Sequence, residues 1–153
     1  MKQLGILSLC LFLLSCNLAS SPEDMDKIRI EDILKGIARD FSWKDIEGIM
    51  EQVHPDYYHK GMYGFQLREL WEDRMARFDL LDVEVQDVDL AGSRATVSMK
   101  LTFTTADSTL SYLDPDTGGD ASYFYREDGV WYLYGDQQNM KQEGGLVPPK
   151  PRN

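Results

Sequence analysis

Both histidines of the chain stand in one short stretch, HPDYYH, where His54 and His59 flank Asp56. A histidine near a carboxylate can take up a proton as a general base. These three residues are therefore catalytic candidates, with Asp136 as a further acid that the fold would have to bring to them. The structural alternative is a loop that ends a helix at Pro55, because the residue before a proline avoids helical angles.

The same side chains do not predict a metal or cofactor site. His54 and His59 are five residues apart and would not share a helix face, and the only cysteines are Cys10 and Cys16. No glycine-rich phosphate loop or calcium-binding loop is present. The formal charge of −10 predicts repulsion from nucleic acid. We therefore expect no metal, no cofactor and no nucleic-acid partner.

Three helical segments would position these residues. The first begins at Ser21-Pro22, a helix-start signal. The second follows a capping-box pattern at 42–45 and ends near His54. The third follows Gly64. Apolar residues at helical spacing predict the buried faces: Ile30, Ile33, Leu34, Ile37, Ala38 and Phe41; then Trp43, Ile46, Met50 and Val53; then Leu67, Leu70, Trp71, Met75 and Phe78.

After Asp79 the period changes from 3.6 to 2, which predicts strands. A first strand over 83–90 has a bulge near Gln86-Asp87, and the next alternates cleanly over 95–104. A third strand spans about 108–113 and leads into a turn rich in proline and glycine. A closing hairpin pairs 121–127 with 130–137. Helices followed by an antiparallel sheet predict an α+β fold.

This order of elements resembles the nuclear transport factor 2-like fold, which also includes SnoaL-like cyclases and ketosteroid isomerases. The resemblance is carried by WKDIEGIM leading to HPDY, and by YREDGVWYL in the closing hairpin, and it covers 26–138. It implies N-terminal helices on a curved, cone-like sheet. It further implies an apolar pocket inside the cone and a homodimer through the sheet face.

The pocket would take its lining from the inward side of the strands. We expect a ligand to contact five residues: Met99, Leu101, Phe103, Tyr112 and Trp131. The inward positions of the strand at 95–104 are apolar, whereas enzymes of this fold place acid–base groups there. The sequence therefore favours non-catalytic binding of a small apolar ligand or a protein partner. A cyclase- or isomerase-type enzyme and a purely structural dimer with a filled core remain as alternatives.

The closing hairpin is aromatic on both faces. A solvated face would be polar, so its outer side is either covered by another subunit or partner, or it carries tyrosines that exposed strands tolerate. Both interpretations stay open.

The N-terminus predicts the location of the protein. An apolar run of about a dozen residues follows Lys2, too short for a spanning helix of roughly 20 residues. It ends in Leu13-Leu14-Ser15-Cys16, which resembles the lipobox of bacterial lipoproteins. The resemblance implies cleavage before Cys16 and acylation of that residue, and acyl chains then hold the protein on the bilayer.

These observations divide the chain into four parts. We expect a signal peptide at 1–15, a lipidated tether at 16–25, the α+β domain at 26–138 and a disordered, proline-rich tail at 139–153. The resemblance to lipoproteins implies a lipid-anchored protein of the cell membrane. In a Gram-negative cell, Asn17 after the cysteine favours the outer membrane, with the domain facing the periplasm or the surface.

Overall fold

The structure is a computed structural model that describes residues 21–138. The predicted signal peptide, Cys16 and the proline-rich tail lie outside the described residues. Residues 22–25, assigned above to the tether, form the first turn of helix α1 (Pro22–Ser42). Ser21 caps this helix: its hydroxyl accepts from the Asp24 N–H at 3.1 Å, and the Asp24 carboxylate accepts from the Ser21 N–H at 3.0 Å.

Helix α1 buries the stripe that its spacing predicts, including Ile30, Leu34, Ile37 and Phe41. The prediction for the next helix is partly wrong. Helix α2 (Ile46–Met50) is short, and its N-cap is Asp45, whose carboxylate accepts from the Gly48 N–H at 3.0 Å.

The predicted capping box at 42–45 does not form, because α1 continues through Ser42. Lys44 then turns the chain at a φ of 60°, and its ammonium donates to the Met75 carbonyl at 2.6 Å and to the Phe78 carbonyl. This turn leaves Trp43 70 % exposed, with Arg39 over its ring at 5.3 Å. The expectation that Trp43 points inward is therefore wrong.

Two very short strands, β1 (Tyr58–His59) and β2 (Met62–Tyr63), precede helix α3 (Gly64–Arg77). The main sheet contains β3 (Leu80–Ala91), β4 (Arg94–Thr104), β5 (Thr109–Asp114), β6 (Tyr123–Glu127) and β7 (Val130–Leu133). All of its neighbouring strands are antiparallel, in the order β3-β4-β6-β7. The predicted bulge in β3 is present between Val85 and Asp87.

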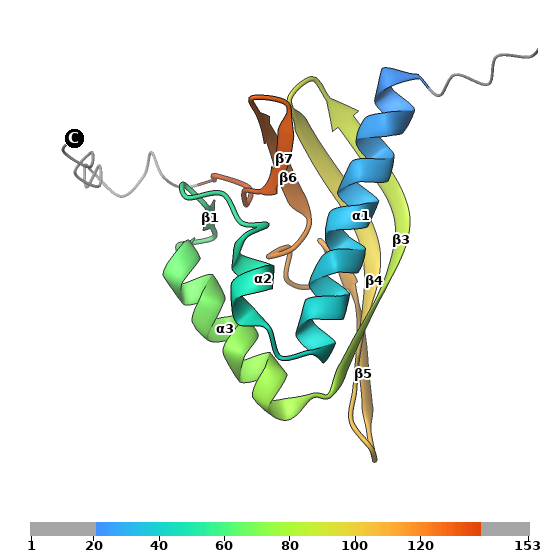
Figure 1. Ribbon diagram of the computed structural model, residues 1–153, viewed down its shortest axis with the longest axis vertical. Helices are drawn as coiled ribbons and strands as arrows, with labels where there is room; N and C mark the ends of the chain where they lie inside the picture. Colours follow the sequence, from blue (N-terminus) through green and yellow to red (C-terminus); the bar gives the residue numbers. More distant parts are fainter. Residues whose placement is uncertain (1–20, 139–153) are drawn as a thin grey trace, which may run out of the picture.

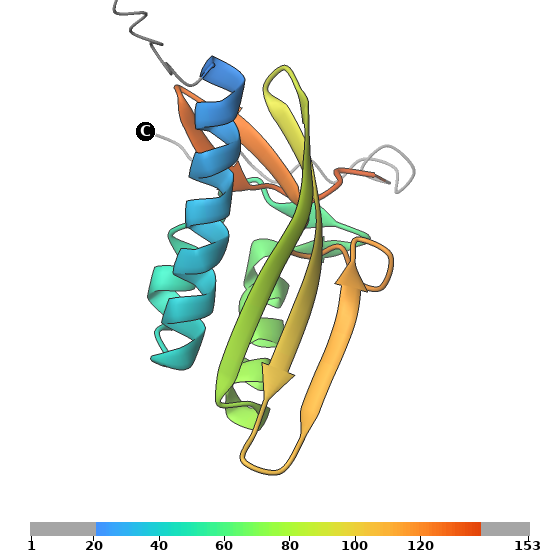
Figure 2. The same ribbon diagram turned by 90° about the vertical axis from the view of Figure 1, so that its right-hand side faces the viewer.

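Strand β4 carries two partners along one edge, and this gives the sheet its shape. Its first residues, Arg94–Thr96, pair with β6, whereas Met99–Thr104 pair with β5. The helices gather on one side of the strongly bent sheet, with β5 at its outer margin (Figures 1 and 2). The inner face of β4 is apolar and closed, as its alternation predicts: Ala95, Val97, Met99, Leu101 and Phe103 are buried.

Candidate functional site

A cleft of about 430 Å³ opens between α3 and the β4–β5 half of the sheet. Helix α3 presents one face to it, because residues three, four and seven apart lie on the same side of a helix. Strand β5 and the loop after it form the opposite wall. The lining consists of Leu70, Asp73, Arg74, Arg77, Phe78, Phe103, Leu110, Tyr112, Thr117 and Gly118. We call this hollow the cone cleft.

Tyr112 is the polar group that β5 places in the cone cleft. It pairs with Leu101 across the strands, and its ring stacks on Phe103 at 5.9 Å. Its hydroxyl is buried, and among residues 21–138 it has no hydrogen-bond partner. Burial raises the pKa of Tyr112 to about 12, so the hydroxyl is neutral at physiological pH. It can therefore donate a hydrogen bond to a molecule in the cleft.

Arg74 lines the cone cleft from the α3 side. Its guanidinium makes two hydrogen bonds to the Asp120 carboxylate, at 2.6 and 3.1 Å, and lies over the rings of Trp71 and Phe103 at 5.0 and 5.5 Å. Burial alone would lower the pKa of Arg74, but the charge and hydrogen bonds of Asp120 outweigh it and raise the pKa. Arg74 is therefore a fixed cation whose charge is already balanced.

The loop between β5 and β6 brings Asp120 to this position. Asp114 holds the loop from inside: its carboxylate accepts from the N–H groups of Gly118 and Gly119 at 3.0 and 2.7 Å, and from the Ser122 hydroxyl at 2.8 Å. A Cβ at Gly118 would meet an Asp120 carboxylate oxygen at 2.9 Å. The sequence predicts a turn here, but not that the turn is a wall of the cleft.

The first catalytic candidate, His54, faces the outer side of the sheet. Its ring lies between Tyr125, Tyr132 and Tyr134, at 6.1, 5.6 and 5.0 Å. Its Nε2 lies 3.0 Å from a Glu127 carboxylate oxygen. These contacts within the chain account for part of the aromatic character of the outer hairpin face.

The backbone N–H of Asp56 donates a hydrogen bond to the Nδ1 of His54 at 3.0 Å, whereas the side chain of Asp56 is exposed. Because the histidine is already partnered at both nitrogens, the stretch around it acts as a loop anchor in this structure. The loop docks beside β7, where the His54 N–H donates to the Leu133 carbonyl at 2.8 Å.

The structure brings together the other two candidates, His59 and Asp136. The Nδ1 of His59 lies 3.4 Å from an Asp136 carboxylate oxygen, and both side chains are buried. Its Nε2 lies 2.9 Å from the Gly118 carbonyl, and its ring stacks on Tyr123 at 5.6 Å. Neither residue lines the cone cleft. The pair lies behind the cleft wall and supports it through Gly118.

The five expected ligand contacts fall into three groups. Phe103 and Tyr112 line the cone cleft. Met99 and Leu101 lie in the closed core and line neither of the two hollows described here. Trp131 lines a second hollow, between α1 and the β6–β7 turn.

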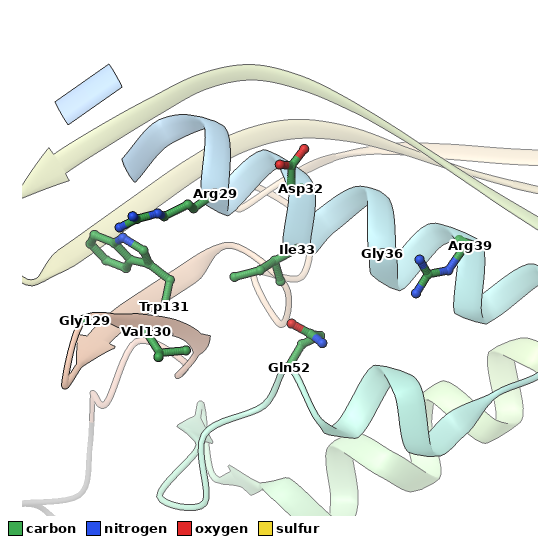
Figure 3. A pocket seen from close by; sticks show the side chains of 9 residues that line it. All are labelled: Arg29, Asp32, Ile33, Gly36, Arg39, Gln52, Gly129, Val130 and Trp131. Carbon is green, nitrogen blue, oxygen red and sulfur yellow. The ribbon is translucent and has the colours of Figure 1, made fainter. Parts of the chain in front are cut away.

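This second hollow, the α1 groove, has a volume of about 480 Å³. Figure 3 shows Ile33 and Gly36 of α1 facing it, with Trp131 beside Arg29 at one end and Arg39 toward the other. Asp26 of α1 fixes Trp131 at that end: its carboxylate accepts from the Trp131 indole at 3.0 Å and from Arg126. The groove is rimmed by ion-paired arginines and contains no unpaired buried polar atom.

Sequence reasoning missed Arg74 and Asp120. One signal was present: Arg74 comes three residues after Trp71, on the face of α3 predicted to be buried. Arginines are seldom buried unless paired. The partner could not be found this way, because Asp120 comes from a loop 46 residues away.

Two negative findings apply to the described part of the chain. No group of three His, Cys, Asp or Glu side chains in 21–138 is placed to hold a metal ion. No helix within the same residues is long and apolar enough to cross a membrane.

Comparison with known proteins identifies the fold. No protein-family model and no curated protein sequence matches the chain. Among solved structures, a nuclear transport factor 2-like protein of unknown function from Shewanella oneidensis aligns with a TM-score of 0.57 at 12 % identity. That alignment covers 72 % of this chain and 96 % of that one.

Two further structures agree. A cystatin-like-fold protein of unknown function from Nostoc punctiforme aligns at 17 % identity, covering 72 % of this chain and 87 % of that one, with a TM-score of 0.52. A protein of unknown function from Mycobacterium tuberculosis aligns at 20 % identity, covering 76 % and 74 %, with a TM-score of 0.52. The chain therefore has the nuclear transport factor 2-like fold that its element order predicts. Identities this low establish the fold alone, and the fold includes both ligand-binding and enzymatic proteins.

Proposed function

We propose that this protein is a lipid-anchored envelope protein whose cone cleft binds a small, largely apolar molecule carrying one hydrogen-bond acceptor. The unpaired Tyr112 hydroxyl is the observation that carries this proposal. A buried polar group without a partner costs free energy, and native structures contain few of them. A ligand acceptor at this hydroxyl would remove that cost.

The other lining residues define the class of ligand. Leu70, Phe78, Phe103 and Leu110 offer apolar and aromatic surface, while the arginines of the cleft are already paired with carboxylates. An anionic ligand would have to compete with those carboxylates. A neutral molecule with a carbonyl or hydroxyl group fits the cleft without breaking an ion pair, and a volume of about 430 Å³ is within the range of ligand pockets.

Catalysis of the cyclase or isomerase type is less well supported. Such a reaction needs a proton-transfer group in contact with the substrate. The one carboxylate that lines the cleft, Asp73, is paired with Arg77 at 2.8 Å. His54, His59 and Asp136 line neither hollow.

The anchor is proposed from the lipobox-like Leu13-Leu14-Ser15-Cys16. Acylated Cys16 would hold the domain on a bilayer, and Asn17 favours the outer membrane in a Gram-negative host. Labelled palmitate should enter the wild-type protein and be lost in Cys16→Ala. Label that persists in this variant would contradict the anchor while leaving the cleft proposal untouched.

The cleft proposal is tested by native mass spectrometry of the protein purified from its own host. We expect a bound small molecule on the wild type and its loss in Leu70→Trp, which fills the cone cleft. Gly36→Phe is the matched control: a Cβ at Gly36 meets no atom within 4 Å, so the ring fills the α1 groove instead. A bound mass that survives Leu70→Trp, or no bound mass on the wild type, would contradict the proposal.

A further inference from the structure

The outer face of the closing hairpin carries tyrosines that the proposed ligand does not contact. Tyr125 of β6 pairs with Tyr132 of β7 across the strands, and alternate residues of a strand share a face. All four tyrosines of this face are half-buried, and none lines either hollow. We call this surface the tyrosine face; it consists of Tyr123, Tyr125, Tyr132 and Tyr134.

The tyrosine face combines aromatic surface with free hydrogen-bond donors. The rings of Tyr125 and Tyr134 contact each other with their centroids 4.9 Å apart, and the His54 ring meets Tyr134 edge-on at 5.0 Å. Among residues 21–138, no group forms a hydrogen bond with any of the four tyrosine hydroxyls. The contacts within the described domain therefore leave both the rings and the hydroxyls available to a further segment.

Rings with hydroxyl donors fit one class of segment well. A proline-rich segment in the polyproline conformation has no internal hydrogen bonds, so its carbonyl groups can accept from a protein surface. Its prolines pack on aromatic side chains, and little conformational entropy is lost because the conformation is already formed. This chain contains such a segment at 146–151, with Pro148, Pro149 and Pro151. The segment lies outside the described residues.

The described chain ends beside the tyrosine face. The side-chain amide of Gln137 donates to the Tyr134 carbonyl at 2.7 Å and to the Asp56 carbonyl at 3.1 Å. Pro148 comes ten residues after Gln138, the last described residue. A ten-residue linker spans on average about 17 Å. The tyrosine face is two strands wide, with neighbouring strands about 4.8 Å apart, so it lies within reach of the segment.

The charges beside the face complement those of the segment. Residues 144–153 contain two cations and no acid. Two exposed acids lie beside the face, because Glu127 contacts His54 through its carboxylate and Asp56 contacts His54 through its backbone N–H. One cation, Arg94, lies over the Tyr125 and Tyr134 rings at 5.9 and 5.8 Å. A second copy would bring the same acids to this surface, whereas the segment brings cations.

We infer that residues 146–151 dock on the tyrosine face of their own chain. The prolines pack on the tyrosine rings, and the carbonyl groups of the segment accept from the tyrosine hydroxyls. This occupant explains the aromatic outer side of the hairpin, which the cone cleft does not explain. It would also replace the disorder that composition predicts for these residues. The inference depends on neither the proposed ligand nor the lipid anchor.

Photo-crosslinking of the full chain in its host cells tests the docking. A benzophenone amino acid takes the place of Val147, which lies outside the described domain. We expect the crosslink to form within one chain, in the monomer band of a denaturing gel. Digestion and mass spectrometry should find it on a peptide that contains Tyr125, Tyr132 or Tyr134.

Substitutions in the tail show whether the prolines cause the docking, and they leave the domain unchanged. Serine at Pro148, Pro149 and Pro151 should reduce the yield of this crosslink at least tenfold. Serine at residues 139–141, the matched control, should leave the yield at the wild-type level. The inference is overturned if no crosslink to the hairpin forms, or if the yield survives loss of the prolines. It is also overturned if Val147 links to another part of the domain, to a second copy or to another protein.

Discussion

Replacing Tyr112 by phenylalanine should change stability and ligand binding in opposite directions. The substitution removes one buried oxygen that has no hydrogen-bond partner among the described residues and keeps the ring stacked on Phe103. Leaving a buried polar group unpaired costs about 1–3 kcal/mol. We therefore expect the free energy of unfolding of the ligand-free protein to rise by about 1 kcal/mol in Tyr112→Phe.

Binding of the molecule identified by mass spectrometry should weaken in the same variant. The lost hydrogen bond contributes about 1 kcal/mol net, which corresponds to roughly a fivefold higher Kd. Urea denaturation of the ligand-free protein measures the first effect, and isothermal titration calorimetry measures the second.

Tyr57→Phe is the matched control for stability. Its hydroxyl is also buried, but it donates to the Asp120 carbonyl at 3.0 Å, so its removal should lower the free energy of unfolding by about 1 kcal/mol. If Tyr112→Phe is destabilised like Tyr57→Phe, the Tyr112 hydroxyl has a partner in the free protein. The reasoning that assigns it to a ligand is then refuted.

Three further predictions follow from the same contacts. Arg74→Met leaves the buried Asp120 carboxylate unpaired and should lower the free energy of unfolding by about 3 kcal/mol, whereas Arg77→Met breaks an exposed pair and should cost less than about 1 kcal/mol by urea denaturation. Gly36→Ala should raise the thermal midpoint, because it improves helix propensity by about 0.8–1 kcal/mol and its Cβ meets no atom. Burial raises the pKa of Tyr112 from 10.0 to about 12, so between these pH values the unfolded chain loses the Tyr112 proton before the folded protein does, and the free energy of unfolding falls as the pH rises from 10 toward 12. Unfolding curves over this range should show a smaller fall in Tyr112→Phe.

The sequence predicted those parts of the fold that depend on local pattern. The apolar stripe of α1, the alternation of β4 and the bulge in β3 follow from spacing alone, and all are present. The second helix was partly wrong because Lys44 adopts a left-handed turn and caps α3, a contact between residues 31 apart. A local pattern contains no information about that contact.

The candidate site was harder to predict for the same reason. Phe103 and Tyr112 were selected as inward-facing residues and do line the cone cleft. The ion pair between Arg74 and Asp120 joins a helix to a distant loop, and no spacing rule links them. His59 and Asp136 meet only because the chain after β7 returns to β1.

The central claim is that the cone cleft holds a small molecule through Tyr112. A crystal structure of the protein purified from its own host tests this most directly. The account predicts electron density for a largely apolar molecule between α3 and β5, with an acceptor atom about 2.7 Å from the Tyr112 hydroxyl. A cleft that contains only solvent, or a molecule seated in the α1 groove instead, would contradict it.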